Sequence, residues 1–137
     1  MDFSTAMAVA ASGMRVQSER MKVISENIAN ADSTSPVPGA DPYRRKVPTV
    51  TSKFDHELGA SMVATGKTIA DKSEFRSQYD PGNPNADKQG YVKLPNVDPL
   101  TEALDMREAQ RAYEANLNVI ETSRAMQMRA LDLLKGG

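Results

Sequence analysis

Apolar side chains recur along the first 31 residues at alternating steps of four and three positions. The series runs Phe3, Met7, Ala10, Met14, Gln17, Met21, Ile24, Ile28 and Ala31, in which eight of the nine side chains are apolar. A heptad-like stripe of this length predicts a long amphipathic helix, because positions three and four apart share one helix face. The run of Asn, Ser and Pro at 30–36 predicts its end.

A second helical pattern covers residues 98–135. Asp98 followed by Pro99 is typical of a helix start, and Gly136-Gly137 is typical of a helix end. From about residue 109 onward the apolar positions fill more than half of the helix circumference, wider than the ~100° that packing on one surface needs. Pairing with the first helix covers one seam. We therefore expect other chains to cover the remaining apolar surface.

The segment 32–97 between these helices has a different composition. It holds seven of the eight prolines and five glycines. Short runs typical of β-strands lie at 43–54, 61–64, 74–79 and 91–94, and residues 80–85 are typical of a turn. The sequence thus predicts a mainly α fold. Two long terminal helices form an antiparallel coiled-coil-like hairpin, and an extended or small β-hairpin segment lies between them.

Composition narrows the function classes. The chain has 137 residues, a formal charge of −1, 39% hydrophobic residues and no cysteine. A near-neutral charge gives no support for nucleic-acid binding, and the lack of cysteine excludes a thiolate nucleophile and a Cys-ligated zinc site. No apolar run reaches the ~18 residues of a membrane span. The first residues lack the pattern of a secretory signal peptide, so we expect none to be cleaved.

Several short motifs resemble catalytic or binding sites, and ordinary structure explains each better. Gly66-Lys67-Thr68 lacks the earlier glycine of a phosphate-binding loop, because position 61 is Ser. The oxygen-rich run 80–87 fits turn chemistry better than a calcium loop. His56 is the only histidine and the chain has no cysteine, so no second such ligand could share a metal with it. The pair Asp105 and Glu108 has no apolar or cationic neighbour in the pattern that would separate their pKa values. We expect no enzyme activity, no metal and no cofactor.

Two polar groups leave alternatives open. Arg44-Arg45-Lys46 beside Tyr43 is either the solvated face of a strand or a contact with phosphate or an acidic polymer. Asn27 and Asn30 lie three residues apart and so share one helix face. They either end the first helix or hydrogen-bond to the backbone of another chain.

Several sequence motifs resemble the bacterial flagellar rod and hook proteins. The N-terminal signature is Ala11-Ser12-Gly13-Met14, then Arg20, then the run 24–34 (Ile-Ser-Glu-Asn-Ile-Ala-Asn-Ala-Asp-Ser-Thr). Residues 42–47, 79–87 and 90–97 are similar to the family's proximal-rod members, and the run 111–116 (Arg-Ala-Tyr-Glu-Ala-Asn) fits the same family. The weakest match covers residues 53–73.

The resemblance implies a structural subunit of the proximal rod of the flagellar basal body. Such subunits polymerise through their terminal helices (here 1–31 and 98–137) into a tube that transmits torque and encloses the export channel, while the middle segment (32–97) lies outside. Implied partners are further copies, adjacent proximal and distal rod subunits, the adaptor at the rod base and the flagellar type III export apparatus. Export proceeds without a cleaved signal into the periplasm-spanning rod. The alternatives are another rod or hook subunit, or a cytoplasmic coiled-coil adaptor.

From the stripes and the resemblance together we expect two sets of contact residues. The assembly interface comprises Phe3, Met7, Met14, Met21, Ile24, Asn27, Ile28, Asn30, Tyr113, Asn116, Leu117, Ile120, Met126, Leu131 and Leu134. The candidate outer contacts are Tyr43, Arg44, Arg45, Tyr79 and Tyr91.

Overall fold

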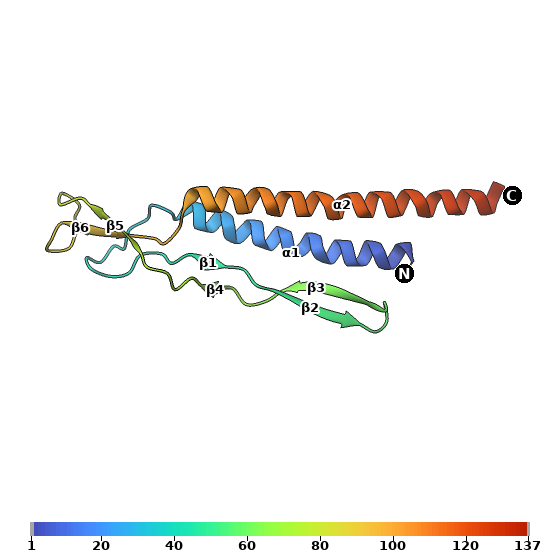
Figure 1. Cartoon of the computed structure of the whole chain (residues 1–137), viewed down its shortest axis with the longest axis horizontal. Coiled ribbons are helices and arrows are strands. Elements are labelled where there is room, and N and C mark those ends of the chain that lie inside the picture. The colour runs from blue at the N-terminus through green and yellow to red at the C-terminus, as the bar shows by residue number, and fades with distance from the viewer. Residues whose placement is uncertain (1, 137) are drawn as a thin grey trace. The chain divides into compact units, whose positions relative to one another are not determined.

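The computed structural model describes residues 2–136, and Figure 1 labels its helices and strands. Helix α1 spans Phe3–Ala29 and helix α2 spans Pro99–Gly136. The strands between them are β1 (Lys46–Val47), β2 (Val50–Asp55), β3 (Ala60–Thr65), β4 (Ile69–Ala70), β5 (Arg76–Tyr79) and β6 (Tyr91–Leu94). The prediction of two terminal helices with short strands between them is confirmed.

Both helices begin at an aspartate cap. The backbone N–H of Thr5 donates to Asp2 Oδ1 over 2.7 Å, and this bond lowers the pKa of the Asp2 carboxyl. Asp98 accepts from the backbone N–H of Leu100 over 3.1 Å and from the hydroxyl of Thr101 over 2.9 Å. Such bonds satisfy N–H groups that have no partner within the helix. The predicted start of α2 is therefore correct, whereas the Asp2 cap was not anticipated.

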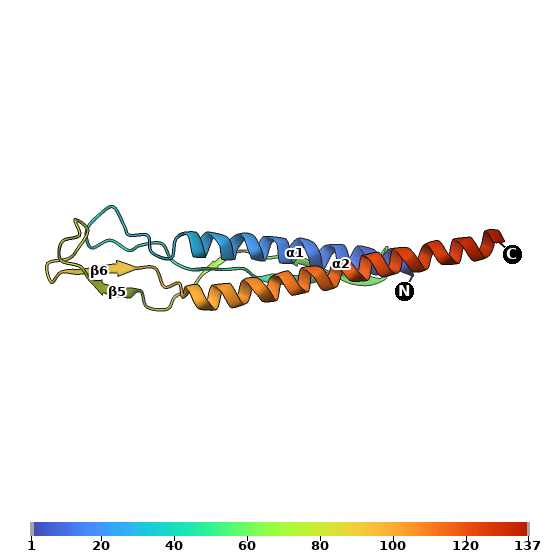
Figure 2. The same ribbon diagram turned by 90° about the horizontal axis from the view of Figure 1, so that it is seen from above.

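Each strand pairs with one other strand, and all three pairs are antiparallel: β1 with β4, β2 with β3 and β5 with β6. Figure 2 displays the β5–β6 pair clearly. The predicted run 43–54 is divided into β1 and β2, with Pro48 between them, because proline has no N–H to donate to a ladder. Gly59, in the β2–β3 turn, has a φ of 67°, which favours glycine.

The chain's contacts group it into two compact units. The first unit contains residues 1–21, 49–67 and 107–137, and the second contains residues 22–48 and 68–106. Each helix contributes to both units.

In the first unit, α1 contacts both the β2–β3 hairpin and α2. The backbone N–H of Val63 donates to the buried Ser12 hydroxyl over 3.2 Å. The next residue, Gly13, lies so close to α2 that an added Cβ would stand 2.7 Å from Asn116 Nδ2. Arg20 forms an ion pair with Glu108 over 3.4 Å. The earlier residue of α1, Gly13, lies against position 116 of α2, whereas the later one, Arg20, pairs with position 108. The two helices therefore run in opposite directions in this unit.

The second unit has a small apolar core with a polar centre. Val97 is fully buried, and Val23, Ile24, Ala31 and Val92 are each less than 8% exposed. Asn27 and Glu102 are also buried, each at 1% exposure. Buried polar groups must be paired, so the partners of these two side chains determine how this unit is built.

Candidate assembly surface and polar junction

Helix α2 buries small or polar side chains and exposes large apolar ones. Its buried positions among the described residues are Glu102, Ala109 and Ser123. The exposed apolar side chains are Leu100, Leu104, Leu117, Val119, Met126, Met128, Leu131, Leu133 and Leu134. The exposed fraction reaches 79% at Leu133 and 82% at Leu134. An apolar surface of this extent is typical of an interaction site.

The last turns of α2 extend beyond the first turn of α1. In the first unit, Gly13 lies against Asn116, so in antiparallel pairing Phe3 lies near residue 126. About ten residues of α2, roughly 15 Å of helix, therefore follow the last position that α1 can reach (Figure 1). This end of α2 carries Met128, Leu131, Leu133 and Leu134, all exposed.

The predicted interface residues of α1 and α2 fall into three exposure classes. Exposed side chains are Ile28, Leu117, Met126, Leu131 and Leu134. Half-buried side chains are Phe3, Met7, Met14, Met21, Asn30, Tyr113, Asn116 and Ile120. Ile24 and Asn27 are buried within the chain, so a second subunit cannot reach them while this unit stays folded. We therefore remove these two from the proposed interface.

Asn27 forms every hydrogen bond that its amide allows. Its Nδ2 donates to the carbonyl of Lys46 over 2.9 Å and to Glu102 Oε2 over 3.3 Å. Its Oδ1 accepts from the Tyr43 hydroxyl over 2.7 Å and from the backbone N–H of Lys46 over 2.9 Å. The interchain bond that we considered for Asn27 is thus replaced by bonds within the chain. Asn30, in contrast, donates to the carbonyl of Glu26 at the end of α1, as a helix-ending residue does.

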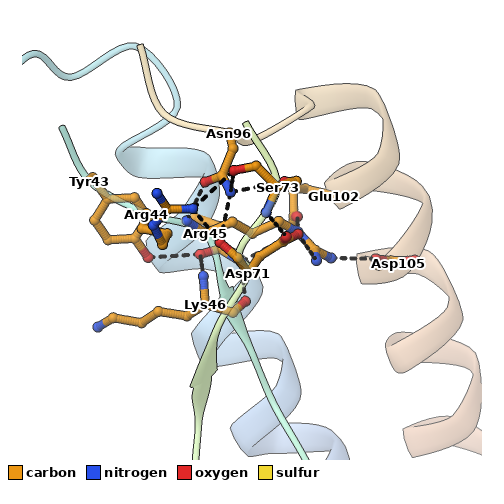
Figure 3. A network of polar contacts seen from close by, with 10 residues as sticks. Tyr43, Arg44, Arg45, Lys46, Asp71, Ser73, Asn96, Glu102 and Asp105 are labelled. Atoms are coloured by element: carbon orange, nitrogen blue, oxygen red, sulfur yellow. Dashed lines mark hydrogen bonds and ion pairs between the residues drawn. The ribbon is translucent and has the colours of Figure 1, made fainter. Parts of the chain in front are cut away.

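Arg45 neutralises the buried Glu102 carboxylate. Its Nε donates to Glu102 Oε1, its Nη1 lies 3.2 Å from Asp71 Oδ2 and its Nη2 lies 3.5 Å from Asp105 Oδ2 (Figure 3). The Glu102 carboxylate raises the pKa of Arg45 above its usual value. Removing one partner from such a pair leaves an uncompensated charge in the interior.

Neighbouring residues complete this polar junction, which we define as Asn27, Tyr43, Arg45, Asp71, Asn96, Glu102 and Asp105. The backbone N–H of Arg45 donates to Asn96 Oδ1 over 2.8 Å, and Asn96 Nδ2 donates to the carbonyl of Asp71 over 3.0 Å. The N–H of Ser73 donates to Asp71 Oδ1 over 2.9 Å and lowers the pKa of that carboxyl. Partial burial raises the pKa of the Tyr43 phenol.

The basic run 44–46 is largely used inside the second unit. Arg44 donates to the carbonyls of Asp71 and Ser73 and lies over the ring of Phe75 at 4.1 Å. The Lys46 ammonium pairs with Glu26 over 3.2 Å, and both side chains are partly exposed. Contact with an external phosphate or acidic polymer would compete with these bonds, so Arg44 and Arg45 are no longer favoured as outer contacts.

Tyr79 and Tyr91 lie opposite each other in the β5–β6 pair. Their rings meet edge to face with centroids 5.2 Å apart, and both are exposed. In the adjoining turn, Asn83 and Asp87 accept backbone N–H groups through their side chains. The interpretation of residues 80–87 as a turn is therefore confirmed.

The sequence had singled out Asn27 and Arg45 but not Glu102, Asp71 and Asn96, which are among their partners. Glu102, Asp71 and Asn96 carry no local signal, since each is an ordinary polar residue of a helix start or a loop. Their function follows from contacts that span 25 to 75 residues of sequence.

Within the described residues, neither helix is long and apolar enough to cross a membrane.

Comparison with known proteins gives a class for this fold and surface. Residues 7–35 match the family described as "Flagella basal body rod protein", and residues 88–133 match "Flagellar basal body rod FlgEFG protein C-terminal". These matches cover most of α1 and most of α2. The protein is therefore a structural subunit of the bacterial flagellar basal-body rod, a family of structural proteins and not of enzymes.

Curated relatives make the assignment more specific. The flagellar basal-body rod protein FlgC of Agrobacterium fabrum is 52% identical over 132 residues, covering 96% of this chain and 95% of the relative. FlgC of Bacillus subtilis is 39% identical (93% and 95% covered), and FlgC of Salmonella typhimurium is 38% identical (91% and 92% covered). The chain belongs to the FlgC family. The alternative of a cytoplasmic coiled-coil adaptor is not favoured.

Proposed function

We propose that this subunit polymerises through the exposed apolar side chains of its helices, above all those at the end of α2 that α1 does not reach, in the proximal part of the rod. The observation that carries the proposal is the contrast on α2, where Ala109 and Ser123 are buried while Leu131 and Leu134 are exposed. Small side chains at the seam let α1 and α2 approach closely as an antiparallel coiled-coil-like pair. The large side chains are then left to contact neighbouring subunits, where their burial contributes about 1.5–3 kcal/mol each.

The helices would form the inner tube around the export channel, and the middle segment would lie outside it. The resemblance to rod and hook proteins supports this arrangement, as does the presence of the apolar surface on the helices. Its partners would be further copies, adjacent proximal and distal rod subunits and the adaptor at the rod base. The subunit would reach the rod through the flagellar type III export apparatus. In the assembled rod it would transmit torque across the periplasm.

Two groups of residues would make the contacts. The helical interface would comprise Phe3, Met7, Met14, Met21, Ile28, Asn30, Tyr113, Asn116, Leu117, Ile120, Met126, Leu131 and Leu134. On the outside, the exposed Tyr79 and Tyr91 would contact a neighbouring subunit.

Charge substitution on α2 tests the interface. Leu131→Asp and Leu134→Asp are introduced separately into a strain that lacks the native chain, and swimming and purified basal bodies are examined. Both side chains are at least half exposed in the chain, so folding should be retained, while a buried unpaired charge should block assembly. Asn118→Asp is the matched control, because it adds the same charge at an exposed position of the same helix whose neighbours one turn away, Glu114 and Glu121, are already charged. Ile24 is unsuitable, since a charge there would unfold the subunit itself.

The outcome separates assembly from folding. Far-UV circular dichroism of each purified variant should match the parent, while basal bodies carrying rods should be absent for the two leucine variants and present for the control. Normal rods with both leucine variants would contradict the proposed interface.

A further inference from the structure

The polar junction connects three segments in an unequal way. Asn27 of α1 forms three of its four hydrogen bonds with residues 43–46 and one with Glu102 of α2. Segment 43–46 is thus attached to α1 directly. The start of α2 is attached mainly through Glu102, and Glu102 needs the guanidinium of Arg45 for its charge.

The loss of one segment would affect the other two unequally. Without residues 43–46, α1 and α2 would bury Asn27 with three unsatisfied bonding positions and Glu102 without a cation. Each unsatisfied buried polar group destabilises the folded unit, and an unpaired buried charge destabilises it more. Without α2, in contrast, Asn27 keeps its three bonds to segment 43–46, and Arg45 keeps Asp71.

We propose that Arg45 is the positioning residue that docks the first turns of α2 onto a unit already formed by α1 and segment 43–46. Docking is therefore ordered: the middle segment joins α1 first, and α2 joins last. The pairing of the helices in this unit is conditional on a folded middle segment. This inference concerns docking within one chain, so it stands apart from the proposed assembly interface and is tested without rods.

Hydrogen exchange of the full-length chain, followed by mass spectrometry, tests the order. In Arg45→Met/Glu102→Met, which removes both charges, the backbone N–H groups of segment 99–106 (all but Pro99) should exchange at least tenfold faster than in the parent. Amides of 22–30 and 43–47 should change less than twofold, because the Asn27 bonds to segment 43–46 remain. In Asn27→Leu, both 43–47 and 99–106 should exchange at least tenfold faster.

A matched control and an internal reference accompany these variants. Glu26→Gln/Lys46→Gln removes the exposed ion pair of the same two segments and should leave all three regions within twofold of the parent. The β2–β3 hairpin (50–65) belongs to the first unit and serves as the reference. Equal acceleration of the hairpin and of 99–106 would mean general destabilisation and would overturn the proposal.

The single substitutions add a readout that lost packing would not produce. Arg45→Met leaves Glu102 buried without a cation, whereas Glu102→Met leaves Arg45 paired with Asp71 and Asp105. Exchange at 99–106 should therefore be fastest in Arg45→Met, and adding Glu102→Met should slow it at least threefold. No rescue by the second substitution, or release of 43–47 together with 99–106 in the double variant, would refute the ordered docking.

Discussion

The contact between Gly13 and Asn116 allows a prediction whose sign depends on how closely the helices approach. A Cβ at position 13 would lie 2.7 Å from Asn116 Nδ2 and 3.0 Å from its Cγ. The Asn116 side chain would have to move and would lose its bond to the carbonyl of Ala112, now 3.0 Å long. A hydrogen bond of this kind contributes about 0.5–1.5 kcal/mol.

Helix propensity acts in the opposite direction. Replacing a glycine by alanine inside a helix stabilises it by about 1 kcal/mol. For Gly13→Ala the gain and the loss should nearly cancel, so the free energy of unfolding should stay within about 0.5 kcal/mol of the parent value. In Gly13→Ala/Asn116→Ala the obstructing side chain is gone, and the variant should be about 1 kcal/mol more stable than Asn116→Ala alone.

Urea unfolding followed by far-UV circular dichroism measures the four members of this double-mutant cycle. The expected coupling between positions 13 and 116 is about 1 kcal/mol. If Gly13→Ala by itself stabilises the chain by the full propensity difference, position 13 is not confined by α2 and the reasoning is refuted. Gly13→Leu extends the series, because a side chain that cannot fit the seam should cost about 1–3 kcal/mol.

Three further predictions concern single interactions. The backbone N–H of Ser73 lowers the pKa of the Asp71 carboxyl. The stabilisation that the charged carboxylate provides is therefore complete above the usual carboxyl pKa of about 3.9 and is lost as the pH falls through the lower pKa of the folded chain. In Asp71→Asn, the melting temperature should fall less steeply as the pH is lowered. Asp98→Ala removes the cap of α2 and should cost about 1 kcal/mol in urea unfolding. Arg76 donates to the carbonyl of Ala31 over 2.5 Å, and Arg76→Met should cost about 1–2 kcal/mol in the same assay, with Arg76→Lys recovering part of it.

The sequence was most informative where the determining signal is local. Asp98 and Pro99 locate the start of α2 because a cap acts on the next two or three residues. The wide apolar sector of α2 correctly indicated unpaired surface, as the exposure of Leu131 and Leu134 shows. These features depend on periodicity and on neighbouring residues, so they can be predicted from a single sequence.

The packing of α1 was less predictable. The heptad series included Ile28, which is 41% exposed, and omitted Ser12, which is fully buried. Ser12 is buried because α1 contacts two elements in the first unit, and the second one, the β2–β3 hairpin, reaches it through a hydrogen bond from the Val63 N–H to the Ser12 hydroxyl. A hydrophobic pattern cannot register a contact of this kind. The functions of Asn27 and Arg45 were hidden for a similar reason, because Glu102 lies 75 residues from Asn27.

The saturated amide of Asn27 also limits how chimeras of rod proteins can be built. A graft that exchanges only the middle segment would keep Asn27 and Glu102 but could replace Tyr43, whose hydroxyl donates to Asn27, and Arg45, whose guanidinium neutralises Glu102. A mismatch at any one of these positions leaves a buried amide or carboxylate unsatisfied. The interchangeable module is therefore larger than the loop itself and includes the end of α1 and the first turns of α2.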